Sequence, residues 1–139
     1  MATTVAEIMT RDPVTIEADQ PVIEAARRMR GADAGNVIVL DQGRVDGILT
    51  DRDIALRVVA EGLDPAGTPA RDVYSRDLTT VAPDTSIDQA VQLIRANAVR
   101  RLPVVEKGQL VGVLSIGDLA IERDEDSALG QISAAVGND

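Results

Sequence analysis

The stretch Gly47-Ile48-Leu49-Thr50-Asp51-Arg52-Asp53 decides the fold of this chain, because a matching stretch, Gly112-Val113-Leu114-Ser115-Ile116-Gly117-Asp118, follows it at an offset of 65 positions, from 53 to 118. In each copy a glycine opens a short apolar segment, a hydroxyl residue closes it, and an aspartate stands three positions after the hydroxyl. This order predicts a strand that runs directly into the first turn of a helix.

Two functions fit such a junction. A helix N-terminus can hold an anion because its first backbone N–H groups lack intrahelical partners, and the aspartate can accept hydrogen bonds from a ribose diol, so the combination suggests a nucleoside phosphate. The alternative is that Thr50 with Asp53, and Ser115 with Asp118, are capping boxes that only satisfy N–H groups of their own helices. We expect the capping hydrogen bonds in either case.

The sequence around the two stretches repeats at the same offset, which indicates an internal duplication. Before each stretch, apolar residues recur at i, i+3, i+4 and i+7, which predicts a helix with one apolar face. These residues are Val22, Ala25, Ala26 and Met29 in the first copy, and Ile87, Ala90, Val91 and Ile94 in the second. We expect Asp19 and Asp84 to stand at the heads of these helices.

The remaining segments complete one structural unit per copy. Two apolar runs around a glycine-containing turn predict a β-hairpin at residues 37–49 and again at 102–114. Residues 11–16 and 76–81 predict short strands, and residues 3–9 and 68–74 short helical turns, with Thr68 as N-cap and Pro69 as the first helical residue. Each copy reads β-α-β-β-α, so the fold class is α+β, and we expect the two units to pack about a pseudo-twofold axis because neither buries enough surface alone.

Composition excludes several classes of function. The chain has 139 residues, of which 45% are hydrophobic and 27% charged, as in a folded globular protein. A net charge of −9 and a single aromatic residue, Tyr74, argue against nucleic-acid binding. Without Cys or His the usual zinc clusters and nucleophile–base pairs cannot form, so we expect no metal site and no enzyme activity. No signal peptide or long apolar segment is present, so we expect a cytoplasmic location and no membrane partner.

Residues 4–120 resemble a tandem CBS-domain protein, or Bateman module, of the stand-alone type. The resemblance implies an adenosyl-ligand sensor that binds AMP, ADP, ATP or S-adenosylmethionine in clefts between the repeats and forms homodimers. The segments that carry it are Ile8-Met9-Thr10 with Pro13-Val14-Thr15, Val99-Arg100-Arg101-Leu102-Pro103-Val104-Val105, and the two stretches quoted above.

The family's ligand contacts carry over to matching positions of this sequence. In the family the motif aspartate takes the ribose hydroxyls and the Ser/Thr lies by the phosphate, while backbone and apolar groups hold the base. The candidate ligand-binding residues are therefore Thr15, Val37, Thr50 and Asp53 for one site, and Thr80, Arg101, Leu102, Pro103, Ser115 and Asp118 for the other.

The two sites are expected to be unequal. Arg100 and Arg101 precede the strand that adjoins Ser115, and cations there would assist an anion, whereas the first copy has uncharged residues at these positions and Asp51 directly after Thr50. The second site is thus expected to bind phosphate better. The alternative is that both arginines are solvated surface charges.

These observations predict the following organisation. Residues 4–62 form repeat 1, 63–67 a linker, 68–122 repeat 2, and 123–139 an acidic C-terminal tail with a possible short helix. The function expected is a regulatory module that binds an adenosine-containing ligand, requires no cofactor, and signals to an unidentified protein partner. The alternative is a structural or interaction module with no functional nucleotide site.

Overall fold

The computed structural model describes residues 3–74 and 78–123, and the chain divides into two compact units. We call residues Val14–Leu78 the central unit, and Met1–Pro13 together with Thr79–Asp139 the split unit. The units do not coincide with the sequence repeats, because the first 13 residues belong to the unit of the second repeat while residues 68–74 belong to that of the first. The expected C-terminal tail lies outside the described residues, apart from Arg123.

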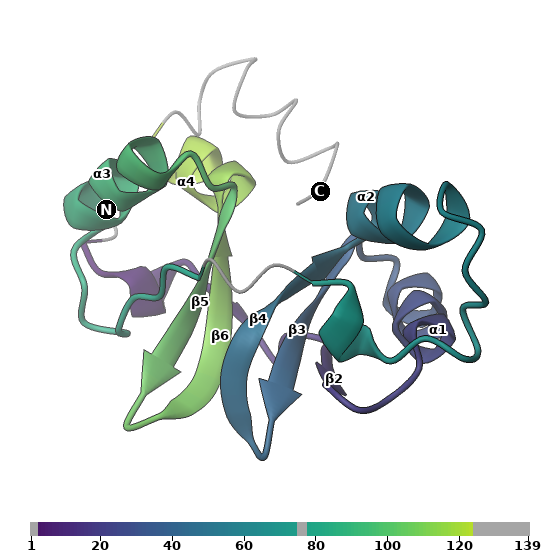
Figure 1. The fold of residues 1–139 in the computed structure, drawn as a ribbon. Helices are drawn as coiled ribbons and strands as arrows, with labels where there is room; N and C mark the ends of the chain where they lie inside the picture. The colour runs from purple at the N-terminus through teal and green to yellow at the C-terminus, as the bar shows by residue number, and fades with distance from the viewer. Residues whose placement is uncertain (1–2, 75–77, 124–139) are drawn as a thin grey trace. The chain divides into compact units, whose positions relative to one another are not determined.

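The central unit contains a three-stranded sheet covered on one face by helices (Figure 1). The strand order is β2-β3-β4, with β2 parallel and β4 antiparallel to β3. In chain order its elements are β2 (Thr15–Glu17), α1 (Val22–Ala32), β3 (Asn36–Asp41), β4 (Arg44–Thr50), α2 (Asp51–Ile54), which continues as the π-helix η2 (Ala55–Val59), and the 3-10 turn η3 (Ala70–Asp72).

The split unit also contains a three-stranded sheet, but its edge strand comes from the start of the chain. The strand order is β1-β6-β5, and both pairings are antiparallel. Its elements are the 3-10 turn η1 (Val5–Glu7), β1 (Thr10–Arg11), α3 (Ile87–Asn97), β5 (Arg101–Glu106), β6 (Gln109–Ser115) and α4 (Ile116–Arg123). Helices and strands are mixed in both units, which confirms the α+β class.

Each unit has its own hydrophobic core, and the helical periodicity correctly identified the faces that form it. On α1 the buried residues are Val22, Ala25 and Met29, and on α3 they are Ile87, Ala90 and Ile94. They pack against alternate residues of the hairpins, among them Val37 and Leu49 in the central unit and Leu102 and Leu114 in the split unit. Burial of the Val, Leu, Ile and Met side chains typically contributes about 1.5–3 kcal/mol each.

Both hairpins form as expected, each around a two-residue turn. Gln42 and Gly43 link β3 to β4 with φ values of 53° and 80°, and Lys107 and Gly108 link β5 to β6 with 52° and 78°. Positive φ at both turn positions matches the right-handed twist of the strands, and it explains the glycine at the second position.

The strand expected at residues 11–16 was wrong in its extent. It is split into β1 and β2, because Asp12 has a φ of 56° and Pro13 cannot donate a ladder hydrogen bond. Its counterpart in the second repeat is reduced to an isolated parallel bridge between Val81 and Val104, within the described part of that segment.

The helix starts also differ from the expected ones. Ser86 rather than Asp84 caps α3, and its hydroxyl accepts a hydrogen bond of 3.1 Å from the Gln89 N–H. Pro69 is the N-cap of η3 instead of its first residue, while the Thr68 hydroxyl donates to the Asp64 carbonyl at 2.8 Å. At α1 the N-cap is Pro21, and Asp19 lies three positions before the first helical residue, Val22.

Candidate functional site

The two strand–helix junctions form the capping boxes that the sequence predicted. In the central unit the Thr50 N–H donates to Asp53 Oδ2 at 3.0 Å, and the Asp53 N–H donates to Thr50 Oγ1 at 3.1 Å. In the split unit the Ser115 N–H donates to Asp118 Oδ2 at 3.1 Å, and the Asp118 N–H donates to Ser115 Oγ at 3.0 Å. Each box engages one carboxylate oxygen, so capping is compatible with a ligand contact at the other oxygen, Oδ1.

Strand register determines which side chain lies beside each hydroxyl. Thr50 pairs with Asn36 across the β3–β4 ladder, and Ser115 pairs with Arg101 across the β5–β6 ladder. The next backbone hydrogen bond beyond the second pair runs from the Ile116 N–H to the Arg100 carbonyl at 2.9 Å. Because this hydrogen bond joins the residues next to the pair, Arg101 and Ser115 form a non-hydrogen-bonded pair. Opposed side chains approach most closely in pairs of this kind.

In the central unit the candidate residues lie on both faces of the sheet. Thr15 pairs with Ile38, and Asn36 pairs with Thr50, so Thr15 and Thr50 share the face opposite the core. The Val37 side chain lies on the other face, inside the hydrophobic core with none of its surface exposed. Val37 can therefore meet a ligand only through its backbone.

The split unit divides its candidates in the same way. The Leu102 side chain is buried in the core, whereas its neighbours Arg101 and Pro103 lie on the opposite face with Ser115. Pro103 accepts a hydrogen bond of 3.0 Å from the Val81 N–H. Thr80 is exposed and directly precedes Val81, so its segment runs beside the strand that carries the arginine.

Burial distinguishes the polar groups at the second junction. Ser115 is only 3% exposed and is a buried polar residue in the part of the chain that the structure describes. Asp118 is half-buried, and desolvation raises its pKa above the ordinary value of 3.8, while the hydrogen bonds with the Ser115 backbone and side chain act in the opposite direction. The hydrogen bonds with Ser115 thus hold the Asp118 carboxylate in a position where it loses solvation free energy.

A cavity in the central unit was not foreseen from the sequence. It has a volume of about 430 Å³ and lies at the end of the sheet where β2 and β3 finish, away from Thr50. It is lined by Glu17, Ala18, Asp19, Asp41, Gln42 and Arg71. Arg71 lines the cavity although it is far from the other lining residues in sequence. Its N–H donates to the Ala18 carbonyl at 2.9 Å, and a local sequence pattern cannot predict such a long-range contact.

Two further features are absent from residues 3–74 and 78–123. No group of three or more acidic side chains is arranged to hold a metal ion. None of the helices described is long and apolar enough to span a membrane.

Comparison with known proteins identifies the family. Residues 5–60 and 70–125 each match the CBS domain, so the chain belongs to the CBS-domain family. Proteins of this class are regulatory or signal-transduction modules that are typically non-catalytic. The chain is 39% identical to the CBS domain-containing protein YhcV of Bacillus subtilis over 91% of its own length and 89% of that protein's. It is 32% identical to hypoxic response protein 1 of Mycobacterium tuberculosis, covering 85% of this chain and 83% of that one.

Solved structures agree with this assignment. A protein with CBS domains from Burkholderia ambifaria superposes with a TM-score of 0.80 at 30% identity, covering 90% of this chain and 96% of that chain. A hexameric CBS-CP12 protein from bloom-forming cyanobacteria superposes with a TM-score of 0.77 at 28% identity, covering 88% and 72%.

Proposed function

We propose that this chain is a regulatory module that binds an adenosine-containing ligand and passes the binding event to a protein partner. The ligand class proposed is AMP, ADP, ATP or S-adenosylmethionine, bound without any cofactor. The coarser part of this function, a regulatory or signal-transduction role, follows from the family. The ligand and the partner are the part that requires experiment.

The observation that carries the proposal is the pairing of Arg101 with Ser115 at the junction that ends in Asp118. The Arg101 guanidinium and the buried Ser115 hydroxyl belong to one strand pair, and the half-buried Asp118 carboxylate lies in the helical turn that follows. A guanidinium and helix N–H groups favour phosphate, and a desolvated carboxylate favours a pair of hydroxyl donors such as a ribose diol.

The first junction is the weaker candidate for a phosphate. Asn36 replaces the arginine, and Asp51 adds a carboxylate at the first helical position, where a bound anion would experience repulsion. The Asp51 side chain accepts a hydrogen bond of 2.8 Å from the Arg52 N–H, which holds it near that helix end. We therefore expect the Ser115 junction to bind first and more tightly.

The competing function is a structural module in which Asp53 and Asp118 only cap helices. The capping boxes satisfy that interpretation as well. Isothermal titration of the full chain with AMP, ADP, ATP and S-adenosylmethionine separates the two functions. We expect heat with at least one ligand, abolished or strongly reduced in Asp118→Asn and little changed in the matched variant Asp53→Asn. Flat traces for all four ligands would favour the structural module.

We also propose that the chain forms a homodimer. Support comes from a structural neighbour that is hexameric, and from large aliphatic side chains that stay exposed in the described residues. Light scattering should return twice the chain mass of 14.7 kDa. A mass equal to one chain at micromolar concentration would refute the dimer.

A further inference from the structure

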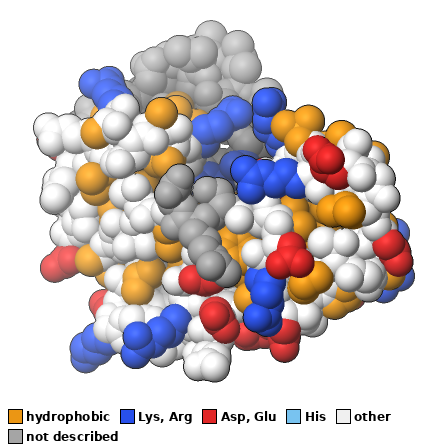
Figure 2. Space-filling model, in the orientation of Figure 1, with side chains coloured by type: hydrophobic (Ala, Val, Ile, Leu, Met, Phe, Trp, Pro, Cys, Tyr) orange, Lys and Arg blue, Asp and Glu red, His pale blue; other side chains and the backbone are white. Residues whose placement is uncertain are grey.

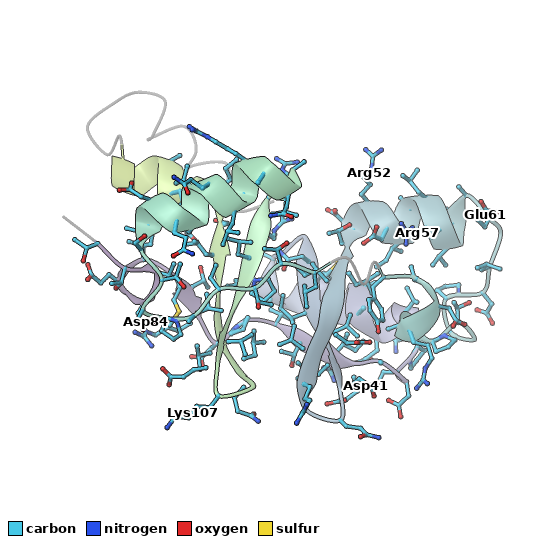
Figure 3. All side chains as sticks on the ribbon, turned by 60° about the vertical axis from the view of Figure 1, so that its left-hand side comes forward. Asp41, Arg52, Arg57, Glu61, Asp84 and Lys107 are labelled. Carbon is cyan, nitrogen blue, oxygen red and sulfur yellow. The ribbon has the colours of Figure 1, made fainter. Side chains whose placement is uncertain are left out.

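The cavity of about 430 Å³ in the central unit lies at the hairpin end of the sheet. Three stretches of chain line it: the end of β2 with the loop that follows, the turn between β3 and β4, and η3. In Figure 3 Asp41 lies toward this end of the sheet. Figure 2 shows acidic side chains gathered with basic ones over the same part of the unit, in the lower part of the view. Sites for small molecules typically have volumes of about 300–1,000 Å³, so the cavity is large enough for a small organic ligand.

The ionisable side chains that line this cavity have no partners inside the chain. Glu17, Asp19 and Asp41 contribute carboxylates, and Arg71 contributes a guanidinium. All of these side chains are exposed, and none forms an ion pair or a side-chain hydrogen bond within residues 3–74 and 78–123. Even Arg44, which lies opposite Asp41 in the β3–β4 ladder, makes no ion pair with it. The carboxylates and the guanidinium are therefore available to a ligand.

Backbone hydrogen bonds hold these side chains around one space. The Ala18 N–H donates to the Leu40 carbonyl at 2.8 Å, which joins the end of β2 to β3. The Ala18 carbonyl in turn accepts from the Arg71 N–H at 2.9 Å, which brings η3 to the same residue. Ala18 is only 3% exposed and is the one apolar residue of the lining. Because the backbone that carries the charges is hydrogen-bonded, little of it has to be ordered when a ligand binds.

The charges of the lining select the chemistry of the ligand. The carboxylates outnumber the guanidinium, so the cavity repels a phosphate or a nucleotide and attracts an organic cation. No group of three or more acidic side chains among the described residues is arranged to hold a metal ion. The Arg71 guanidinium repels a simple diamine, but it can bind a carboxylate through two parallel hydrogen bonds. A molecule with two cationic groups and one carboxylate matches this set, and basic amino acids carry these groups.

We propose that the cavity binds a basic amino acid such as lysine or arginine. The α-carboxylate of the ligand pairs with Arg71, and its α-ammonium and side-chain cation contact the three acidic side chains of the lining. The cavity is separate from the Ser115 junction. It therefore gives the module a second input that does not depend on the proposed adenosine-containing ligand.

Isothermal titration of the full chain tests the proposal with L-lysine and two analogues that each lack one group. Cadaverine lacks the carboxylate of lysine, and norleucine lacks its side-chain ammonium. We expect L-lysine to bind at least about tenfold more tightly than either analogue, because each analogue loses hydrogen bonds between charged groups. Flat traces with both L-lysine and L-arginine would overturn the proposal. Cadaverine that binds as tightly as lysine would overturn the assignment of an amino acid.

Substitutions in the lining test the individual contacts. Arg71→Gln should weaken lysine binding about tenfold and leave cadaverine binding unchanged or tighter, because only lysine has a carboxylate, whereas Asp41→Asn should weaken both. The matched controls are Arg30→Gln and Asp33→Asn, which make the same charge changes at the exposed end of α1 and should leave lysine binding unchanged. Thermal melting verifies that all variants fold. A lysine affinity that stays unchanged in Arg71→Gln or in Asp41→Asn would overturn the assigned site.

Discussion

Arg101 lies directly across from Ser115 in the β5–β6 ladder, while the equivalent position across from Thr50 is occupied by Asn36. The two junctions share a capping box and a strand register, but they differ in the residue opposite the hydroxyl and in Asp51, which follows Thr50 where Ile116 follows Ser115. These two charge differences make the two candidate sites experimentally separable.

The first prediction concerns those charges. Arg101→Ala should weaken binding of AMP or ATP by about tenfold, because a hydrogen bond to a charged group contributes about 1.5–3 kcal/mol. Asp51→Ala removes a carboxylate from the first junction and should leave binding unchanged or strengthen it. Titration calorimetry of both variants measures the contrast. A crystal soaked in AMP with density only beside Thr50 and Asp53 would contradict the assignment.

The second prediction concerns the carboxylate of Asp118. Asp118→Asn keeps the shape of the side chain but removes the charge that two ribose hydroxyls would contact, so affinity should fall by about 1.5–3 kcal/mol, a factor of about ten to a hundred or more. An adenosine analogue that lacks the 2′-hydroxyl should lose affinity for the natural chain but little further affinity for the variant. Equal losses for both proteins would mean that the carboxylate only caps α4.

The third prediction follows from the raised pKa of Asp118. A ribose diol donates to the ionised carboxylate, so affinity should fall as pH decreases through the raised pKa, starting above the ordinary value of 3.8. Asp118→Asn should abolish this dependence.

The pH dependence of folding stability has the opposite sign to that of ligand affinity, because the folded chain holds the Asp118 proton more tightly than the unfolded chain. The stabilising contribution of Asp118 should be complete at acid pH and be lost as pH rises through its folded-state pKa, which denaturant titrations at several pH values can measure.

The fourth prediction concerns the contact between the chain's start and β6. Gly112 pairs with Arg11, and a Cβ at this position would lie 2.6 Å from Met9 Sδ and 2.9 Å from the Thr10 carbonyl. Gly112→Ala should therefore destabilise the chain by about 1–3 kcal/mol, the typical cost of overpacking. Gly31→Ala is the matched control, because a Cβ there meets nothing within 4 Å and should stabilise α1 by about 0.5–1 kcal/mol. Calorimetric melting of both variants tests the difference in sign.

The fifth prediction uses a strained helix end. Ala98 terminates α3 with a φ of 52°, a conformation that costs a side chain with Cβ about 1–2 kcal/mol. Ala98→Gly should raise the free energy of unfolding by about 0.5–1 kcal/mol, and Ala98→Val should lower it. Asp33 ends α1 in the same conformation, but Asp33→Gly should gain less because aspartate tolerates it better. An unchanged melting temperature in Ala98→Gly would refute the strain.

The sequence by itself determined several features that depend on neighbours along the chain, although not the exact starts of the helices. The capping boxes join residues three apart, the apolar faces of α1 and α3 follow helical spacing, and the hairpins close over two residues, so each is decided within a few positions. The motifs in the two copies resemble the CBS family, to which the chain belongs, and that resemblance implies the candidate residues Thr50, Asp53, Ser115 and Asp118.

Only the tertiary structure decided which distant segments meet. Thr10 and Arg11 pair with β6, about a hundred positions away, instead of continuing into β2, because the left-handed residue Asp12 redirects the chain and an open strand edge is available in the split unit. Packing of the helices on one face of each sheet sends the Val37 and Leu102 side chains into the cores, and it leaves Leu56 and Val59 exposed. Local pattern cannot determine these outcomes, since strand alternation fixes two faces but the partner strand decides which face is buried.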